Sequence, residues 1–168
     1  MKILFLDIDG VLNDHAPHPN SYCGMSLEKL EHLNVVVGTT KCHIVLASAW
    51  RYLVLNGQMT LGGFGSMMLT HGASRLVAGS IVGTLAADRH PGDPDDRGHL
   101  ARDWAAEYKK SLNVTHAVAL DDGVNTHDLG YASVGIPCVR PVSSVGLTAY
   151  DANRVIDLFG RDKSKVPA

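Results

Sequence analysis

The chain has 168 residues, of which 45% are hydrophobic and 19% are charged, and its formal net charge is −2. These values predict one globular domain over residues 1–168 and exclude a disordered chain. They also argue against a strongly basic nucleic-acid surface over the whole molecule, although a local basic patch is compatible with them.

The sequence further indicates a cytoplasmic protein that does not bind membranes. No apolar run approaches the roughly 18 residues of a membrane span. The N-terminus carries one lysine and then enters an apolar run, without the cleavage site of a signal peptide. Cys23, Cys42 and Cys138 are widely spaced and suit neither a zinc site nor a disulfide framework.

The first predicted element is a strand that begins at Ile3. Four large apolar residues in a row are too short for a helix and indicate a strand buried on both faces. This strand ends abruptly in Asp7 and Asp9, with Gly10 after them. Two carboxylates at the exit of a buried strand are costly unless a cation lies beside them. The pair therefore predicts an active site.

The next elements are less uniform. Residues 13–25 are rich in turn formers and predict a loop or a small flap. We expect a helix with Ser26 as its N-cap, which ends at Gly38. Residues 42–47 predict a second buried strand, followed by the start of a helix at residues 49–51. Glycines interrupt any regular period in residues 56–79, where only a short helix is indicated.

The second half predicts three further strands and two helices. The strands are expected at residues 81–85, 114–120 and 134–139, and the helices at residues 97–112 and 148–159, with a loop at residues 88–96. This alternation predicts an α/β fold, a three-layer sandwich in which helices cover both faces of a five-stranded, mainly parallel sheet.

Polar residues follow three of the predicted strands. The first strand ends in Asp7 and Asp9, the second in Ser48, and the fourth in Asp121 and Asp122. Ligands of open α/β sheets bind at the carboxyl ends of strands, so these side chains should converge. Their mutual repulsion would raise their pKa values or expel the cluster unless a divalent cation neutralised it. Oxygen ligands without a neighbouring His or Cys predict Mg²⁺.

Phosphoryl transfer uses this set of groups. One aspartate can attack phosphorus and form an aspartyl-phosphate, while Mg²⁺ offsets the repulsion between them. A second carboxylate can protonate the leaving oxygen and then activate water. A hydroxyl and a cationic side chain can hold the remaining phosphoryl oxygens.

The same residues resemble the haloacid dehalogenase (HAD) superfamily. The run from Phe5 to Leu12 looks like its first motif, Ser48 its second, and Asp121-Asp122 its acidic fourth motif. Arg97 stands where the third motif, usually Lys and sometimes Arg, is expected. The four motifs occur in order over about residues 3–123, and the resemblance implies a HAD-like Rossmannoid fold.

The resemblance also implies a role for each matching catalytic residue. Asp7 is similar to the nucleophile and first metal ligand, and Asp9 to the general acid/base, whose backbone carbonyl also binds Mg²⁺. Ser48 resembles the phosphoryl-oxygen donor, and Arg97 the cation that steadies nucleophile and phosphate. A carboxylate two positions after the nucleophile is typical of the family's phosphatases and argues against a dehalogenase.

Two further sets of residues follow. The resemblance implies that Asp121 binds the metal, with Asp122 second or through water. The residues expected to contact substrate are Gly10, Ser48, Ala49 and Arg51, the last through a second phosphate.

Several short segments resemble the small HAD domains of "Swiss army knife" RNA-repair proteins. They are Asp7 to Asn13, Ser48-Ala49-Trp50-Arg51, Arg97-Gly98-His99, Leu120-Asp121-Asp122 and Val145-Gly146-Leu147-Thr148. The resemblance implies a phosphatase for nucleotide or nucleic-acid-end phosphates. The alternatives are a phosphatase for sugar or other metabolite phosphates and a non-catalytic phosphate-binding regulatory module. The costly acidic cluster argues against the module.

The chain leaves little room for a cap domain over the site, either before Ser26 or between Ser48 and Arg97. We therefore expect a minimal cap or none, with an open site partly closed by the flap and by loop 88–96. Such a site admits a nucleic-acid end, or a small phosphorylated molecule if a homo-oligomer covers it.

Other interpretations of single residues remain open from the sequence. Asp7 to Asp9 lacks the ligands of a calcium loop but is compatible with a surface turn. Ser48 can cap the following helix, and Arg97 can be a solvated helix-start residue. Trp50 suits a core position better than a base-stacking platform. The remaining candidates are His99, Arg89 or Arg51 as the cation, His15, His18 and Tyr22 as substrate contacts, and Asn125 and Asp128 as supports of the acidic loop.

Overall fold

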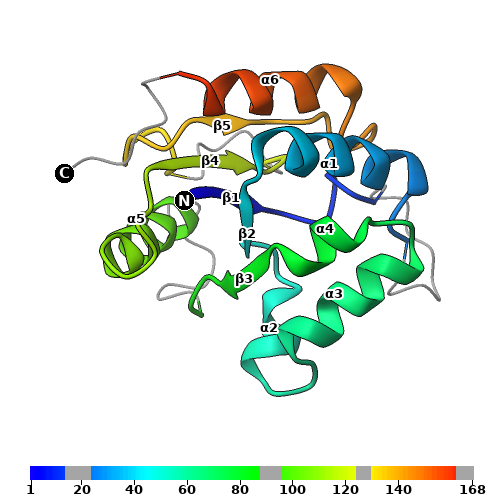
Figure 1. The fold of residues 1–168 in the computed structure, drawn as a ribbon, viewed down its shortest axis with the longest axis horizontal. Helices are drawn as coiled ribbons and strands as arrows, with labels where there is room; N and C mark the ends of the chain where they lie inside the picture. The colour runs from blue at the N-terminus through cyan, green and yellow to red at the C-terminus, as the bar shows by residue number, and fades with distance from the viewer. Residues whose placement is uncertain (14–23, 88–95, 124–129, 162–168) are drawn as a thin grey trace.

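The computed structural model describes residues 1–13, 24–87, 96–123 and 130–161. Its centre is a five-stranded sheet with the order β3-β2-β1-β4-β5, in which all neighbouring strands are parallel (Figure 1). The strands are β1 (Lys2–Leu6), β2 (His43–Leu46), β3 (Ile81–Thr84), β4 (His116–Leu120) and β5 (Cys138–Val139). The predicted five-stranded α/β sheet is confirmed, and the strand that precedes Asp7 is its central member.

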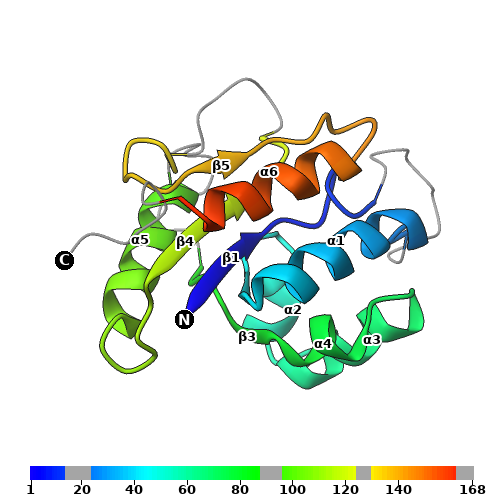
Figure 2. The same ribbon diagram turned by 45° about the horizontal axis from the view of Figure 1, so that its top comes forward.

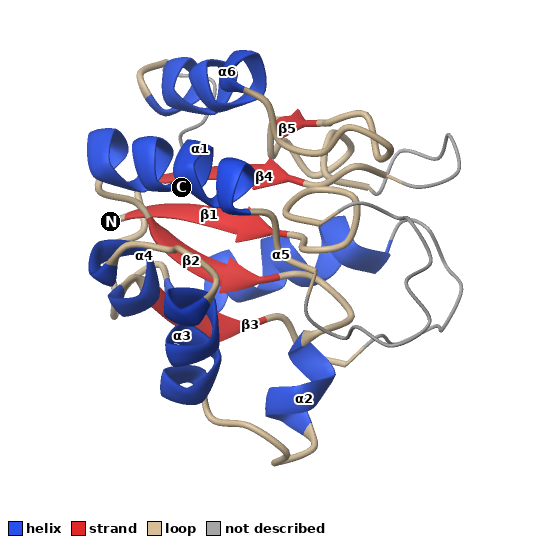
Figure 3. Ribbon diagram, turned by 90° about the vertical axis from the view of Figure 1, so that its right-hand side faces the viewer, coloured by secondary structure: helices blue, strands red, loops and turns tan. Residues whose placement is uncertain are grey.

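Helices cover both faces of this sheet. The helices are α1 (Leu27–Thr40), α2 (Arg51–Leu55), α3 (Leu61–Thr70), α4 (Arg75–Gly79), α5 (Asp96–Tyr108) and α6 (Ala149–Phe159). Helices α1 and α6 lie side by side over one face (Figure 2), together with α3 and α4, whereas α5 lies behind the sheet in Figure 3. The result is the three-layer sandwich that the sequence predicts.

Strand β1 is apolar from Ile3 to Leu6 because helices cover both faces of the sheet. Leu4 and Leu6 pack into the cluster with α1 and α6, while Ile3 and Phe5 pack into the cluster with α5. The ring of Phe5 meets Trp104 of α5 edge-on, with ring centroids 6.0 Å apart. Successive strand residues point to opposite faces, so a strand covered on both sides must be apolar throughout.

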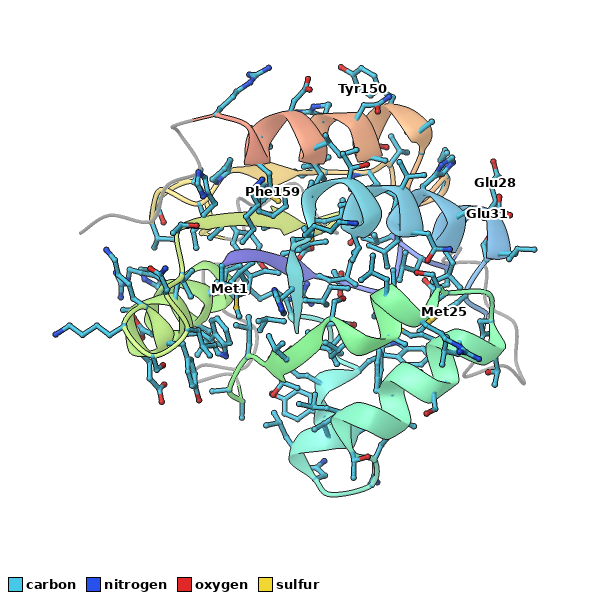
Figure 4. The ribbon with its side chains drawn as sticks, viewed as in Figure 1. Met1, Met25, Glu28, Glu31, Tyr150 and Phe159 are labelled. Atoms are coloured by element: carbon cyan, nitrogen blue, oxygen red, sulfur yellow. The ribbon has the colours of Figure 1, made fainter. Side chains whose placement is uncertain are left out.

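Helix α6 shows the opposite pattern, with one buried face. Phe159 is only 2% exposed and lies on the side facing the sheet, whereas Tyr150 is 71% exposed and points away from it (Figure 4). Thr148 begins the helix with a capping box, in which its side chain and that of Asp151 each bond the other's backbone N–H. The helix predicted at residues 148–159 is confirmed.

The glycine-rich segment is more ordered than expected. It contains α3 and α4, whose N-caps Thr60 and Ser74 accept the backbone N–H of the third helical residue. A Cβ on Gly65 would lie 2.8 Å from the carbonyl oxygen of Ala78, so glycine allows the two helices to pack closely. Phe64 of α3 is buried in the sheet cluster, and these helices therefore belong to the core layer, not to a separate cap.

Several predicted boundaries are wrong by a few residues. The first helix passes Gly38 and ends at Thr40, where Lys41 adopts a left-handed φ of 56°. Helix α5 ends at Tyr108, and β4 begins at His116. The fifth strand shrinks from residues 134–139 to Cys138–Val139, because turns occupy residues 131–135.

Some predicted features lie outside the described residues. They are most of the flap and of loop 88–96, Cys23, His15, His18, Tyr22, Arg89, Asn125 and Asp128. Within the described part of the chain, no helix is both long and apolar enough to cross a bilayer.

Candidate active site

The carboxyl ends of the strands lie at one edge of the sheet (Figure 3), and the predicted site residues follow β1, β2 and β4 there. Hydrogen bonds continue the sheet one residue past the strands. The N–H of Asp7 donates to the carbonyl of Leu120 (2.9 Å), and the N–H of Ala47 donates to Leu6 (2.8 Å). Asp7, Ser48 and Asp121 therefore begin side by side at the carboxyl ends of β1, β2 and β4, where α/β sheets bind ligands.

Arg97 links the two buried carboxylates of this edge. Its Nη1 lies 2.8 Å from Oδ2 of Asp121 and 3.3 Å from Oδ2 of Asp7. Asp7 is 4% exposed and Asp121 is fully buried. Burial alone would lower the pKa of Arg97, but the charges of Asp121 and Asp7 outweigh it and raise that pKa above its ordinary value. The structure thus brings Arg97 against both Asp7 and Asp121, as the sequence analysis expects.

One arginine does not balance the site. Burial raises the pKa of Asp7 from 3.8 to about 7, and the charge of Asp121 adds to the shift. Arg97, the N–H of Ile8 and the hydroxyl of Ser48 oppose it without cancelling it. Without a further cation, Asp7 therefore holds its proton far more strongly than an exposed aspartate.

A group of oxygen ligands surrounds this excess of negative charge. Asp7, Asp121 and Asp122 each offer one carboxylate oxygen, and these atoms lie within 4.8 Å of one another. Hard divalent cations prefer such oxygen ligands, and a cation here would compensate the carboxylates that Arg97 leaves unbalanced. The cluster is thus a possible metal site at the end of β1 and β4.

Ser48 faces the proposed nucleophile. The residue is fully buried, and its hydroxyl hydrogen-bonds Asp7. Its Oγ also accepts the backbone N–H of Trp50 at 3.3 Å. That bond makes a local turn at the end of β2 and leaves the hydroxyl hydrogen available to the site.

Arg51 is buried and donates hydrogen bonds to backbone carbonyls. It is 1% exposed, and its Nη1 donates to the carbonyls of Ala47 and Ser48, each at 3.0 Å. Its Nε donates to Ala86 at 3.1 Å. These bonds hold the backbone that follows β2 and β3, and the expected phosphate contact of Arg51 stays a prediction.

The other two expected substrate contacts differ in exposure. Ala49 is exposed beside Ser48, whereas Gly10 is buried in the turn after β1. Gly10 adopts a φ of 73°, and its N–H donates to Oδ1 of Asn13 at 2.9 Å. Glycine suits this turn because side chains disfavour the left-handed region.

Asp9 lies in the same turn and is half-buried. Nε1 of Trp50 is 3.0 Å from each of its carboxylate oxygens, and Nδ2 of Asn13 donates to Oδ1 at 2.7 Å. The sequence interpretation favoured Trp50 as a core residue and missed this contact. The position of Trp50 two residues after Ser48 was the sequence feature that could have placed it near the site.

Tyr131 is a second residue that the sequence analysis did not select. It is fully buried, and its hydroxyl lies 3.5 Å from the Asp121 oxygen that Arg97 also contacts. Burial, followed by the charge of Asp121, raises the pKa of Tyr131 well above its ordinary value, so its hydroxyl remains a donor at neutral pH. Tyr131 follows Gly130, whose backbone touches the first turn of α5.

That contact depends on Gly98. A Cβ on Gly98 would lie 2.1 Å from the carbonyl carbon of Gly130. We expect Gly98→Ala to lower the free energy of unfolding by about 1–3 kcal/mol, as overpacking does, and to reduce turnover by displacing Arg97. Chemical denaturation measures the first effect, and kcat the second.

Gly38→Ala is the matched control for this substitution. Gly38 lies inside α1, and a Cβ added there would meet no atom within 4 Å. Alanine should stabilise that helix by up to about 1 kcal/mol and leave turnover unchanged. Equal effects of the two variants would show that the close approach at Gly98 has no importance for the site.

The fold and the site together define a class of protein. A parallel sheet with carboxylates after β1 and β4 and a hydroxyl after β2 is a HAD-like Rossmannoid domain. The chain belongs to the family of HAD domains in Swiss Army Knife RNA repair proteins, whose family model matches residues 3–152. No curated protein and no solved structure gave a significant match. Membership of this family suggests a phosphatase type of hydrolase.

Proposed function

We propose that this protein is a Mg²⁺-dependent phosphomonoesterase that acts through an aspartyl-phosphate on Asp7. One observation carries the proposal. Asp7 leaves the central strand into a position where Arg97, Ser48 and Asp121 all contact or face its carboxylate. A nucleophile, a hydroxyl donor, a cation and a second carboxylate are the groups that an acyl-phosphate mechanism requires.

The residues fit Mg²⁺ as the cofactor. The donor set is made of carboxylate oxygens from Asp7, Asp121 and Asp122, and its charge exceeds what Arg97 supplies. The backbone carbonyl of Asp9 is the further oxygen that the resemblance assigns to the metal. When bound, Mg²⁺ would neutralise charge shared by Asp7 and a phosphoryl oxygen.

The protein's own groups account for the first half-reaction. A carboxylate oxygen of Asp7 attacks phosphorus as the bond from phosphorus to the ester oxygen breaks. The electron pair of that bond stays on the leaving oxygen, which takes a proton from Asp9. Arg97 and Ser48 hold the other phosphoryl oxygens, and the product is a phosphorylated Asp7 with a free alcohol.

The second half-reaction restores the enzyme. Asp9, now ionised, removes a proton from water while the water oxygen attacks phosphorus. The bond from phosphorus to the Asp7 oxygen breaks, and inorganic phosphate leaves. Asp7 is again a carboxylate and Asp9 again carries its proton, so the cycle balances.

The proposed substrates are nucleotide or nucleic-acid-end phosphates. Two observations support this class. The matching family is described by its occurrence in RNA repair proteins. In the described residues, α3 and α4 belong to the core layer and form no separate cap, which suits a bulky substrate.

A substrate panel tests this choice. We expect the highest kcat/KM for oligonucleotides with a 3′- or 5′-phosphate or for mononucleotides, and lower values for sugar phosphates. A preference for sugar phosphates would keep the reaction but reassign the substrate. Equal, very poor rates throughout, unaffected by Mg²⁺, would favour a phosphate-binding module without turnover.

A further inference from the structure

Trp50 contacts two groups of the site through two different N–H groups. Its backbone N–H donates to Oγ of Ser48 at 3.3 Å, and its indole Nε1 lies 3.0 Å from both carboxylate oxygens of Asp9. The half-buried indole meets the fully buried ring of Phe64 edge-on, with centroids 6.2 Å apart. The ring is therefore packed against the core while its N–H points into the site.

Asp9 needs such a contact more than Asp7 does. Asp7 is enclosed at the sheet edge, but Asp9 lies in a turn after β1 and is half-buried. A half-exposed aspartate can rotate toward water, and a general acid displaced by about 1 Å loses much of its rate advantage. Fixed donors on both oxygens restrict that rotation.

The donors also distinguish the two oxygens of Asp9. Asn13 accepts the N–H of Gly10 with its Oδ1, so the nitrogen of its amide faces Asp9. Oδ1 of Asp9 must therefore stay an acceptor for Asn13. Among the described residues, the one hydrogen bond to Oδ2 of Asp9 comes from the indole of Trp50. The nearly equal distances allow the indole N–H to serve Oδ1 when Oδ2 carries a proton.

We propose that Trp50 is a positioning residue for the general acid, which holds Asp9 so that Oδ2 is the oxygen that donates the proton. This inference rests on the proposed function. It assigns Trp50 to the protonation of the leaving group and not to the attack of Asp7. The two steps respond differently to the leaving group, which makes the assignment testable.

The test compares two esters in wild type and in Trp50→Phe, which keeps an aromatic ring beside Phe64 but removes the N–H. An alkyl phosphate needs protonation of its leaving oxygen, whereas p-nitrophenyl phosphate does not. We expect kcat/KM, which reports the first half-reaction and not the later hydrolysis of the aspartyl-phosphate, to fall about 10- to 100-fold for the alkyl ester and less than about threefold for the aryl ester. Equal losses for both esters would overturn the proposal.

Trp104→Phe is the matched control, since Trp104 is the chain's other tryptophan and lies in the α5 core. It should reduce stability without changing the ratio of the two rates. A ratio that shifts equally in this variant would show that general loosening, and not Asp9, is responsible.

A double-mutant cycle asks whether Trp50 acts through Asp9. In the Asp9→Asn background there is no acid left to position, so adding Trp50→Phe should change the alkyl-ester rate less than about twofold. A further loss as large as in the wild type would contradict a role through Asp9.

The contact can also be measured without turnover. Each of the two tryptophans should give one indole N–H signal in an NMR spectrum, and the signal that Trp104→Phe removes identifies the other as that of Trp50. Asp9→Ala should move the Trp50 signal upfield and leave the Trp104 signal in place. An unmoved Trp50 signal would overturn the proposal. If the wild type hydrolyses neither ester with Mg²⁺, the proposed function fails, and this measurement still decides whether Trp50 holds Asp9.

Discussion

Replacing Asp7 by Asn is expected to lower kcat/KM for any phosphomonoester by about 10⁴-fold or more. The amide is a poor nucleophile and cannot form the acyl-phosphate bond. Asn has nearly the same size and shape as Asp, so the substitution removes the charge that lies 3.3 Å from Nη1 of Arg97 with little change in volume. Steady-state phosphate release with saturating Mg²⁺ measures the effect, and Asp7→Ala should behave in the same way.

The surface substitution Asp157→Asn is the control for this experiment. The Asp157 side chain is 67% exposed and lies 3.9 Å from Arg161 at the end of α6, far in sequence from the site residues. Its kcat/KM should equal that of the wild type. An Asp7→Asn variant with full activity would remove Asp7 from the role of nucleophile.

The metal-free protein is expected to lose stability as the pH rises from about 4 to about 7. Burial raises the pKa of Asp7 in the folded state from 3.8 to about 7, so the folded state binds this proton more strongly than the unfolded state does. The stabilising effect is fully present below pH 3.8 and is lost as the pH passes through the folded-state pKa. Thermal unfolding in a chelator, followed across this range, measures the slope.

The Asp7→Asn variant and the addition of Mg²⁺ test whether Asp7 causes this pH dependence. Asp7→Asn carries no titrating group there and should unfold at a higher temperature than the metal-free wild type at pH 8, with the difference vanishing near pH 4. Mg²⁺ at about 100 times its dissociation constant should stabilise the wild type by about 2.7 kcal/mol at pH 8, and far less at pH 5. A wild type whose stability ignores both pH and Mg²⁺ would contradict the buried acidic cluster.

The central strands and the acidic residues could be predicted because they follow from short, strong patterns. Buried parallel strands need continuous apolar residues, and Asp7, Ser48 and Asp121 interrupt such runs at the point where each strand ends. The parallel order of the strands then places these interruptions at one edge. Their convergence is a consequence of topology, and it needs no knowledge of side-chain direction.

The missed features depend on directions that the sequence does not specify. Trp50 is amphipathic, and whether its N–H faces Asp9 or solvent depends on the turn that Ser48 makes. The hydrogen bonds of the buried Arg51 to backbone carbonyls likewise depend on how the backbone turns after β2 and β3. The extent of helices α3 and α4 was not predicted from the sequence, because glycine lowers helix propensity. In the structure, Gly65 permits the close packing of the two helices.

The most direct test of the account is to trap the phosphoryl group on the protein. The enzyme is mixed with excess substrate and Mg²⁺, quenched in acid within the first turnover, and digested for mass spectrometry. We predict that the peptide containing Asp7 gains the mass of one phosphoryl group, that the gain is absent in Asp7→Asn, and that it disappears when substrate is exhausted. Turnover without any phosphorylated peptide, or with the phosphoryl group on another residue, would contradict the account.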